Sequence, residues 1–165
     1  MELRIVDFEK LSRHYKRYQD GLEVIEFHKK KYIDLIDPIK KEMSSIIASH
    51  QSGLVIDSRS QKERAERFQK LQEDIMSIDK TATSELTEIR DKMTKEVYGD
   101  LEKIITEWSI ENSIDLVMGK IECVYVSEKN EITNQILEVL KSMDVYVEYI
   151  EEEKSEELEE EKESV

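Results

Sequence analysis

The sequence predicts an α+β protein that is mainly α, in which a long antiparallel helical hairpin projects from a small β body. Charged residues make up 39% of the chain, which has four glycines and one proline. This composition favours long helices over a sheet sandwich. Apolar residues recur at three- and four-residue steps through two long tracts, and alternating apolar runs lie near both ends of the chain.

The first tract follows a short apolar run at residues 3–8, which predicts a strand. Asp7 is expected to cap the helix after it. Along residues 15–47 the apolar positions form a coiled-coil heptad seam. Lys29 stands at one seam position, and Pro38 removes one backbone hydrogen bond. We therefore expect a kinked but continuous helix.

A cluster of Gly and Ser within residues 49–60 interrupts the heptads, so the chain is expected to reverse there. Ser58 or Ser60 is the expected cap of the return helix. That helix repeats the apolar spacing over residues 68–108. The two stripes can bury each other, which predicts a hairpin arm over residues 10–111.

After residue 112 the apolar spacing changes from helical to alternating. Residues 114–118 and 122–126 predict two strands joined by a tight turn. Thr133 is expected to cap a short helix at 134–143. Residues 145–150 are strand-like by composition, and an added strand is left open there.

These segments, with residues 1–9, form the predicted β body at residues 1–9 and 112–150. The body is too small for a secure core, so oligomerisation through its sheet is expected. The side chains expected to build the oligomer body are apolar and lie on the predicted strands: Leu3, Ile5, Leu116, Val124 and Val126.

The net charge of −14 argues against nucleic acid or an anionic membrane as the main partner. No apolar run approaches the roughly 20 residues that span a bilayer, so stable membrane insertion is not expected. The charge is uneven, because residues 10–70 carry 14 basic and 9 acidic side chains. Residues 151–165 hold nine Glu and two Lys, which predicts a disordered acidic tail.

Catalytic and metal sites are not expected. His14, His28 and His50 lie too far apart along the predicted helix to share a metal or to serve one nucleophile. No Gly-rich phosphate loop is present, so no cofactor is expected. Cys123 is the single cysteine and cannot form an intramolecular disulfide.

The predicted tip carries an apolar triplet, Leu54, Val55 and Ile56, where a polar turn would suffice. Either the triplet packs into the end of the hairpin, or it forms a sticky arm end that contacts other proteins. Basic side chains flank it in the sequence: Lys40, Lys41, Arg59, Lys62, Arg64 and Arg67. Lys29 and Pro38 have a similar double interpretation, as ordinary helix features or as sources of arm flexibility.

Short motifs at both ends of the chain carry a family resemblance. They are residues 3–10 at the front, and 114–118, 124–126 and 131–137 at the back. Their order and separation resemble the Skp (OmpH) family of trimeric holding chaperones, over about residues 2–143. The resemblance implies a homotrimer whose helical arms enclose unfolded outer-membrane proteins without ATP.

This sequence departs from the family pattern in being acidic and in adding residues 145–165. No signal peptide is evident at the start, so the compartment is left open. It is periplasmic if a signal peptide was removed and cytoplasmic if Met1 is the native start. The first functional hypothesis is an ATP-independent holding chaperone. The second is a structural or scaffolding coiled-coil protein that binds one folded partner, and an enzyme is least expected.

Overall fold

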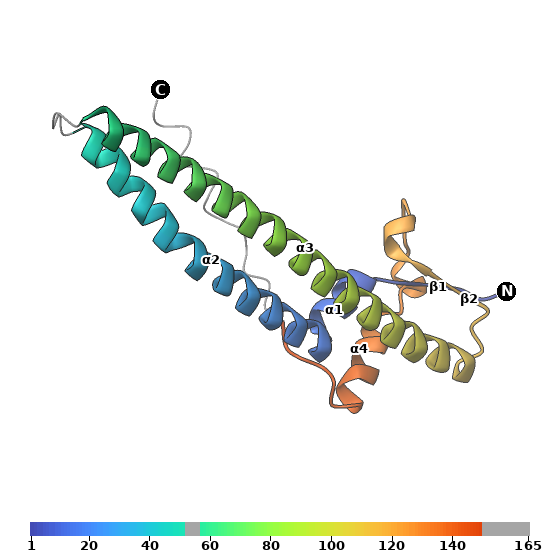
Figure 1. Cartoon of the computed structure of the whole chain (residues 1–165). Helices are drawn as coiled ribbons and strands as arrows, with labels where there is room; N and C mark the ends of the chain where they lie inside the picture. Colours follow the sequence, from blue (N-terminus) through green and yellow to red (C-terminus); the bar gives the residue numbers. More distant parts are fainter. Residues whose placement is uncertain (52–56, 150–165) are drawn as a thin grey trace, which may run out of the picture. The chain divides into compact units, whose positions relative to one another are not determined.

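The computed structural model describes residues 1–51 and 57–149, so the predicted tip triplet lies outside the described residues. These residues form two compact units. The β unit contains residues 1–16 and the described residues from Ile104 onward, and the hairpin unit is Arg17–Lys103. A mainly helical α+β protein with a small sheet is thus confirmed (Figure 1).

The sheet of the β unit has two parallel strands. Strand β1 (Leu3–Val6) pairs with β2 (Leu116–Gly119), with Ile5 opposite Met118. On its other side β1 is bridged by Glu131, and the Ile132 N–H donates to the Ile5 carbonyl at 2.9 Å. Strand β1 is therefore the inner strand. Among the described residues, no strand lies along the outer edge of β2.

The predicted second strand at residues 122–126 is wrong. After β2 the chain enters the 3-10 helix η1 (Lys120–Glu122), and later a second one, η2 (Glu128–Asn130). The Cys123 N–H donates to the Lys120 carbonyl at 3.0 Å, so the chain coils here and does not reverse as a hairpin. Strand β2 pairs instead with β1. The long helical segment that lies between β1 and β2 in the sequence provides the crossover that parallel strands require.

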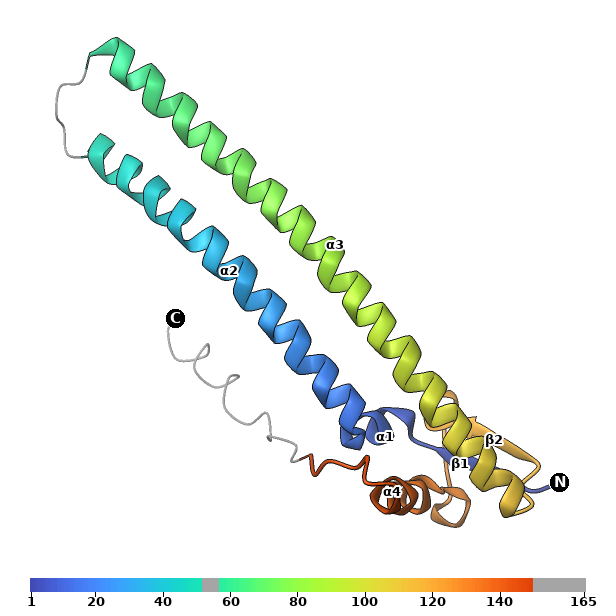
Figure 2. The same ribbon diagram turned by 60° about the horizontal axis from the view of Figure 1, so that its bottom comes forward.

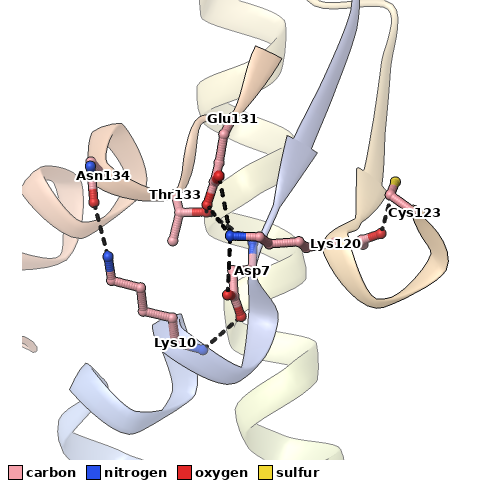
Figure 3. A network of polar contacts seen from close by, with 8 residues as sticks. Asp7, Lys10, Lys120, Cys123, Glu131, Thr133 and Asn134 are labelled. Atoms are coloured by element: carbon pink, nitrogen blue, oxygen red, sulfur yellow. Dashed lines mark hydrogen bonds and ion pairs between the residues drawn. The ribbon is translucent and has the colours of Figure 1, made fainter. Parts of the chain in front are cut away.

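A polar network ties the end of β1 to the segments that follow the sheet (Figure 3). The Lys120 ammonium donates to Glu131 Oε1 at 3.0 Å and lies 3.9 Å from Asp7 Oδ2. The hydrogen bond to Glu131 holds the pKa of Lys120 above its usual value. The Thr133 hydroxyl accepts from the Asp7 N–H at 2.9 Å and donates to Glu131 at 3.1 Å.

Thr133 is therefore not the cap that the sequence predicts. It is the first residue of α4 (Thr133–Ser142), whose N-cap is Ile132. Its hydroxyl is committed to Asp7 and Glu131. The apolar face of α4 was predicted correctly, since Ile136, Leu137 and Leu140 are all buried.

The first helix begins as predicted but ends early. Asp7 caps α1 (Phe8–His14) by accepting from the Lys10 N–H at 3.0 Å. The helix then breaks at Tyr15, and α2 (Lys16–Gln51) follows. The predicted single helix is wrong at this point, although α2 does run through Pro38 without interruption. Residues 145–150 add no strand among the described residues, because Tyr146 makes only an isolated bridge to Tyr15.

In the hairpin unit α2 lies antiparallel to α3 (Ser58–Glu111), and both views show them side by side (Figures 1 and 2). The expected cap of α3 is wrong, because Asp57 Oδ1 accepts from the Ser60 N–H at 2.7 Å and takes that role. This bond lowers the pKa of Asp57. The buried apolar residues of the hairpin unit lie on facing stripes of the two helices: Ile25, Tyr32, Leu71, Ala82, Met93, Val97 and Leu101.

Thr133→Val should destabilise the protein by about 1–3 kcal/mol, because the Asp7 N–H loses its hydrogen bond to the Thr133 hydroxyl while the side-chain volume is kept. Urea unfolding measures this. Thr87→Val, at an exposed position on α3, is the matched control and should change the unfolding free energy much less. Equal effects of the two substitutions would show that the Asp7 bond is not stabilising.

Candidate functional site

The hairpin is clamped by ion pairs between its helices at both ends. Arg17 on α2 donates to Glu96 and Asp100 on α3, both at 2.7 Å. Toward the tip, Arg67 on α3 makes a two-pronged contact with Glu42 on α2, at 2.6 and 2.8 Å. The hydrogen bond from Arg67 lowers the pKa of Glu42. These pairs match one antiparallel register and lie toward the two ends of the hairpin unit.

A polar layer interrupts the apolar seam where His28 and Tyr32 on α2 meet Glu85 on α3. The predicted seam position of Lys29 is wrong, since Lys29 is exposed and pairs with Glu26 of its own helix. His28 is half-buried, with Nδ1 3.9 Å from Glu85 Oε2 on α3. The Tyr32 hydroxyl donates to the same carboxylate oxygen, which raises the pKa of Tyr32. The layer selects one register, because shifting it would bury these groups against apolar neighbours.

The helices approach closely near Gly21. A Cβ atom at this position would lie 2.2 Å from the sulfur of Met93 on α3. Because the clash would be with a flexible side chain, a larger residue here would displace Met93 rather than part the backbones. Gly21 therefore lets Met93 fill the space between the two helices.

Near the tip, residues of both helices line a groove of about 650 Å³, which we call the tip groove. Its apolar lining comes from Ile46 and Ile47 on α2 and from Ala65 and Phe68 on α3. Polar side chains also line it: His50, Gln61, Arg64, Gln69 and Gln72. An apolar floor beside adaptable amide and basic groups suits an apolar peptide segment.

The basic side chains predicted to surround the tip are largely paired. Arg59 contacts Glu63 at 3.1 Å, and Lys62 lies 3.8 Å from Glu66. Arg64 donates to the Ser49 hydroxyl at 3.1 Å. Lys40 and Lys41 are exposed on α2. The structure therefore places the named basic residues on the two helices and pairs Arg59, Lys62 and Arg67 with carboxylates, while Arg64 contacts a neutral hydroxyl.

Large apolar side chains on both helices lie outside the buried stripes. Phe27 is 71% exposed, Met76 63% and Ile33 56%. We call the full set the outer apolar residues: Val24, Phe27, Ile33, Leu35, Ile47, Met76 and Tyr98. Sequence reasoning followed the seam and missed them. The available signal was an apolar residue directly beside a seam residue, as at 24, 33, 35 and 47.

The β unit carries its own exposed apolar group in and beside η1. Ile121, Val124 and Tyr125 are almost fully exposed, and we call them the η1 cluster. Of the residues predicted for the oligomer body, Val124 belongs to this cluster and Leu116 is partly exposed at the edge strand. Ile5 is buried in the core of its own unit. Leu3 and Val126 are half-buried.

Within residues 1–51 and 57–149, no three His, Cys, Asp or Glu side chains are grouped so that they could hold a metal ion. Of the helices that the structure describes, none is both long enough and apolar enough to cross a membrane.

Comparison with known families gives one match. A family model described as "Outer membrane protein (OmpH-like)" matches residues 3–140. The match covers both strands and the whole helical hairpin, and it stops within α4. Comparison with curated proteins finds no match.

Glu42→Gln should lower the melting temperature at pH 7 and have little effect at about pH 2. Arg67 depresses the folded-state pKa of Glu42, so the stabilisation is present above the unfolded pKa of about 4.3 and is lost as pH falls through the folded value. Thermal unfolding across this pH range measures it. Glu88→Gln on α3 is the control, and an E42Q effect that persists unchanged in acid would contradict the assignment.

Proposed function

The chain belongs to the OmpH-like family, and on that basis we propose that it is an ATP-independent holding chaperone for unfolded or partly folded proteins. Family membership supports a chaperone-like role in general. The observation that carries the holding activity is the exposure of the outer apolar residues on the hairpin. Large apolar side chains that remain in water are available to contact apolar segments of other proteins.

The distribution of these residues suits unfolded clients better than one folded partner. They are spaced along most of α2 and along α3 from Met76 to Tyr98. An unfolded chain offers apolar side chains at irregular intervals, so it can engage several scattered contacts at once. Many weak contacts then give a useful overall affinity while leaving each segment able to dissociate.

The tip groove is proposed as one of these contacts. Ile46, Ile47 and Phe68 would bind an apolar client side chain, while Arg64 and the neighbouring amides accommodate client polar groups. The triplet Leu54, Val55 and Ile56 remains a proposed client contact on its sequence alone. Lys40, Lys41, Arg59 and Lys62 are proposed to attract acidic client segments, and Lys29 and Pro38 to keep α2 adaptable.

We further propose that the protein works as a homotrimer with outer-membrane proteins among its clients, as the family resemblance implies. The outer edge of β2 and the η1 cluster support self-association through the β unit. An unpaired strand edge readily pairs with another chain. Three hairpins around a common body would then surround a client and separate it from other clients.

Replacing Phe27, Ile33 and Met76 together by Ser should weaken client retention about tenfold, equivalent to about 1.4 kcal/mol, because three exposed apolar contacts are lost. The measurement is light scattering after an outer-membrane β-barrel protein is diluted from urea into stoichiometric chaperone. The control replaces Lys80, Glu88 and Lys95, exposed polar residues of α3, by Ser.

Protection by the control should match that of the parent protein. If the apolar triple variant also protects fully, the outer apolar residues do not hold clients. Selective binding of one folded protein, with no suppression of aggregation, would favour the scaffolding role.

A further inference from the structure

The break between α1 and α2 has no local cause. Residues 8–20 contain neither Gly nor Pro, and their composition allows a helix throughout. Yet Tyr15 adopts an extended conformation, with φ −90° and ψ 121°. Tyr15 is also buried, so its conformation is set by contacts from other parts of the chain.

The contacts come from the segment that follows α4. The Lys16 N–H donates to the Val145 carbonyl at 2.8 Å, and the Val147 N–H donates to the His14 carbonyl at 2.8 Å. Tyr15 and Tyr146 thus form an antiparallel bridge. In an uninterrupted helix the Lys16 N–H would instead reach the Ser12 carbonyl, and the His14 carbonyl would accept from Tyr18. The Lys16 N–H and the His14 carbonyl are therefore hydrogen-bonded in either case, by the segment after α4 or within a continuous helix.

Aromatic rings hold the segment in place. The ring of Tyr146 stacks on His14, with centroids 5.2 Å apart and planes within 4°. Tyr149 meets His14 edge to face at 6.2 Å. The His14 Nδ1 lies 3.1 Å from the Val147 carbonyl oxygen. We call residues 145–149 the C-terminal staple.

The end of α4 directs the staple toward the joint. Asp144 has a left-handed φ of 57°, its N–H donates to the Lys141 carbonyl, and the Val145 N–H donates to the Leu140 carbonyl at 3.2 Å. This is the Schellman arrangement that ends many helices. The family match stops at residue 140, so the staple lies outside the matched region.

We propose that the C-terminal staple determines whether α1 and α2 are two separate helices or one continuous helix. With the staple bound, Tyr15 is extended and the two helices are separate. When the staple leaves, the freed backbone groups pair along the chain, and α1 and α2 join into one helix through Tyr15. This proposal does not rest on the client-holding role, since the staple belongs to the β unit and the outer apolar residues belong to the hairpin unit.

Val147→Pro in the full-length chain tests the proposal, because proline lacks the N–H that binds the His14 carbonyl. The readout is the ¹³Cα secondary chemical shift of Tyr15, its deviation from the random-coil value, which has opposite signs in extended and helical backbone. We expect the shift to change from the extended to the helical sign. Glu148→Pro, which keeps the Val147 N–H, is the control and should leave Tyr15 extended.

Tyr146→Ala provides a second test that leaves every backbone donor in place. It removes the ring stacked on His14 and should move the Tyr15 shift in the same direction. Methyl signals of Leu11 and Ile136 report whether the core of the β unit remains folded. An extended Tyr15 in a folded Tyr146→Ala protein, or in a folded Val147→Pro protein, would overturn the proposal.

Discussion

Two helices lying side by side can bury only one stripe of each, and this limit governs the hairpin. The facing stripes take Ile25, Tyr32, Leu71 and Met93 out of water. Every other apolar side chain on α2 and α3 within the hairpin unit must remain in solvent or find another protein. The outer apolar residues are therefore a direct consequence of the two-helix architecture, and we propose that they also bind clients.

Contacts between distant parts of the sequence define the β unit. Strand β1 at the start of the chain pairs with β2 after the hairpin, and the Asp7 N–H depends on Thr133. The C-terminal staple completes the backbone hydrogen bonds at Tyr15. Helix α3 can fold largely from local signals, whereas the sheet and the α1–α2 joint form only when both ends of the chain come together. The β unit should therefore be slower to form than the helices.

The parts of the fold that follow from periodicity could be predicted from sequence: both long helices, their antiparallel pairing, the β1 strand, and the apolar face of α4. The predictions that failed concern side chains with several possible hydrogen-bond partners, where the sequence does not show which partner is used. Asp57 outcompetes Ser58 and Ser60 as a cap, and Thr133 bonds to Asp7 instead of capping α4. His28 and Lys29 are adjacent, so heptad counting could not decide which one faces Glu85. The tip groove depends on the spacing of two helices, which no pattern along one of them reveals.

We propose that several copies of this chain together hold one client on the outer apolar residues of their hairpins. Native mass spectrometry of the full-length protein, alone and after an unfolded outer-membrane protein is added, tests it most directly. We expect a complex of three chains that gains a single client without losing a subunit. A stable monomer, or a trimer that binds no unfolded client, would contradict it.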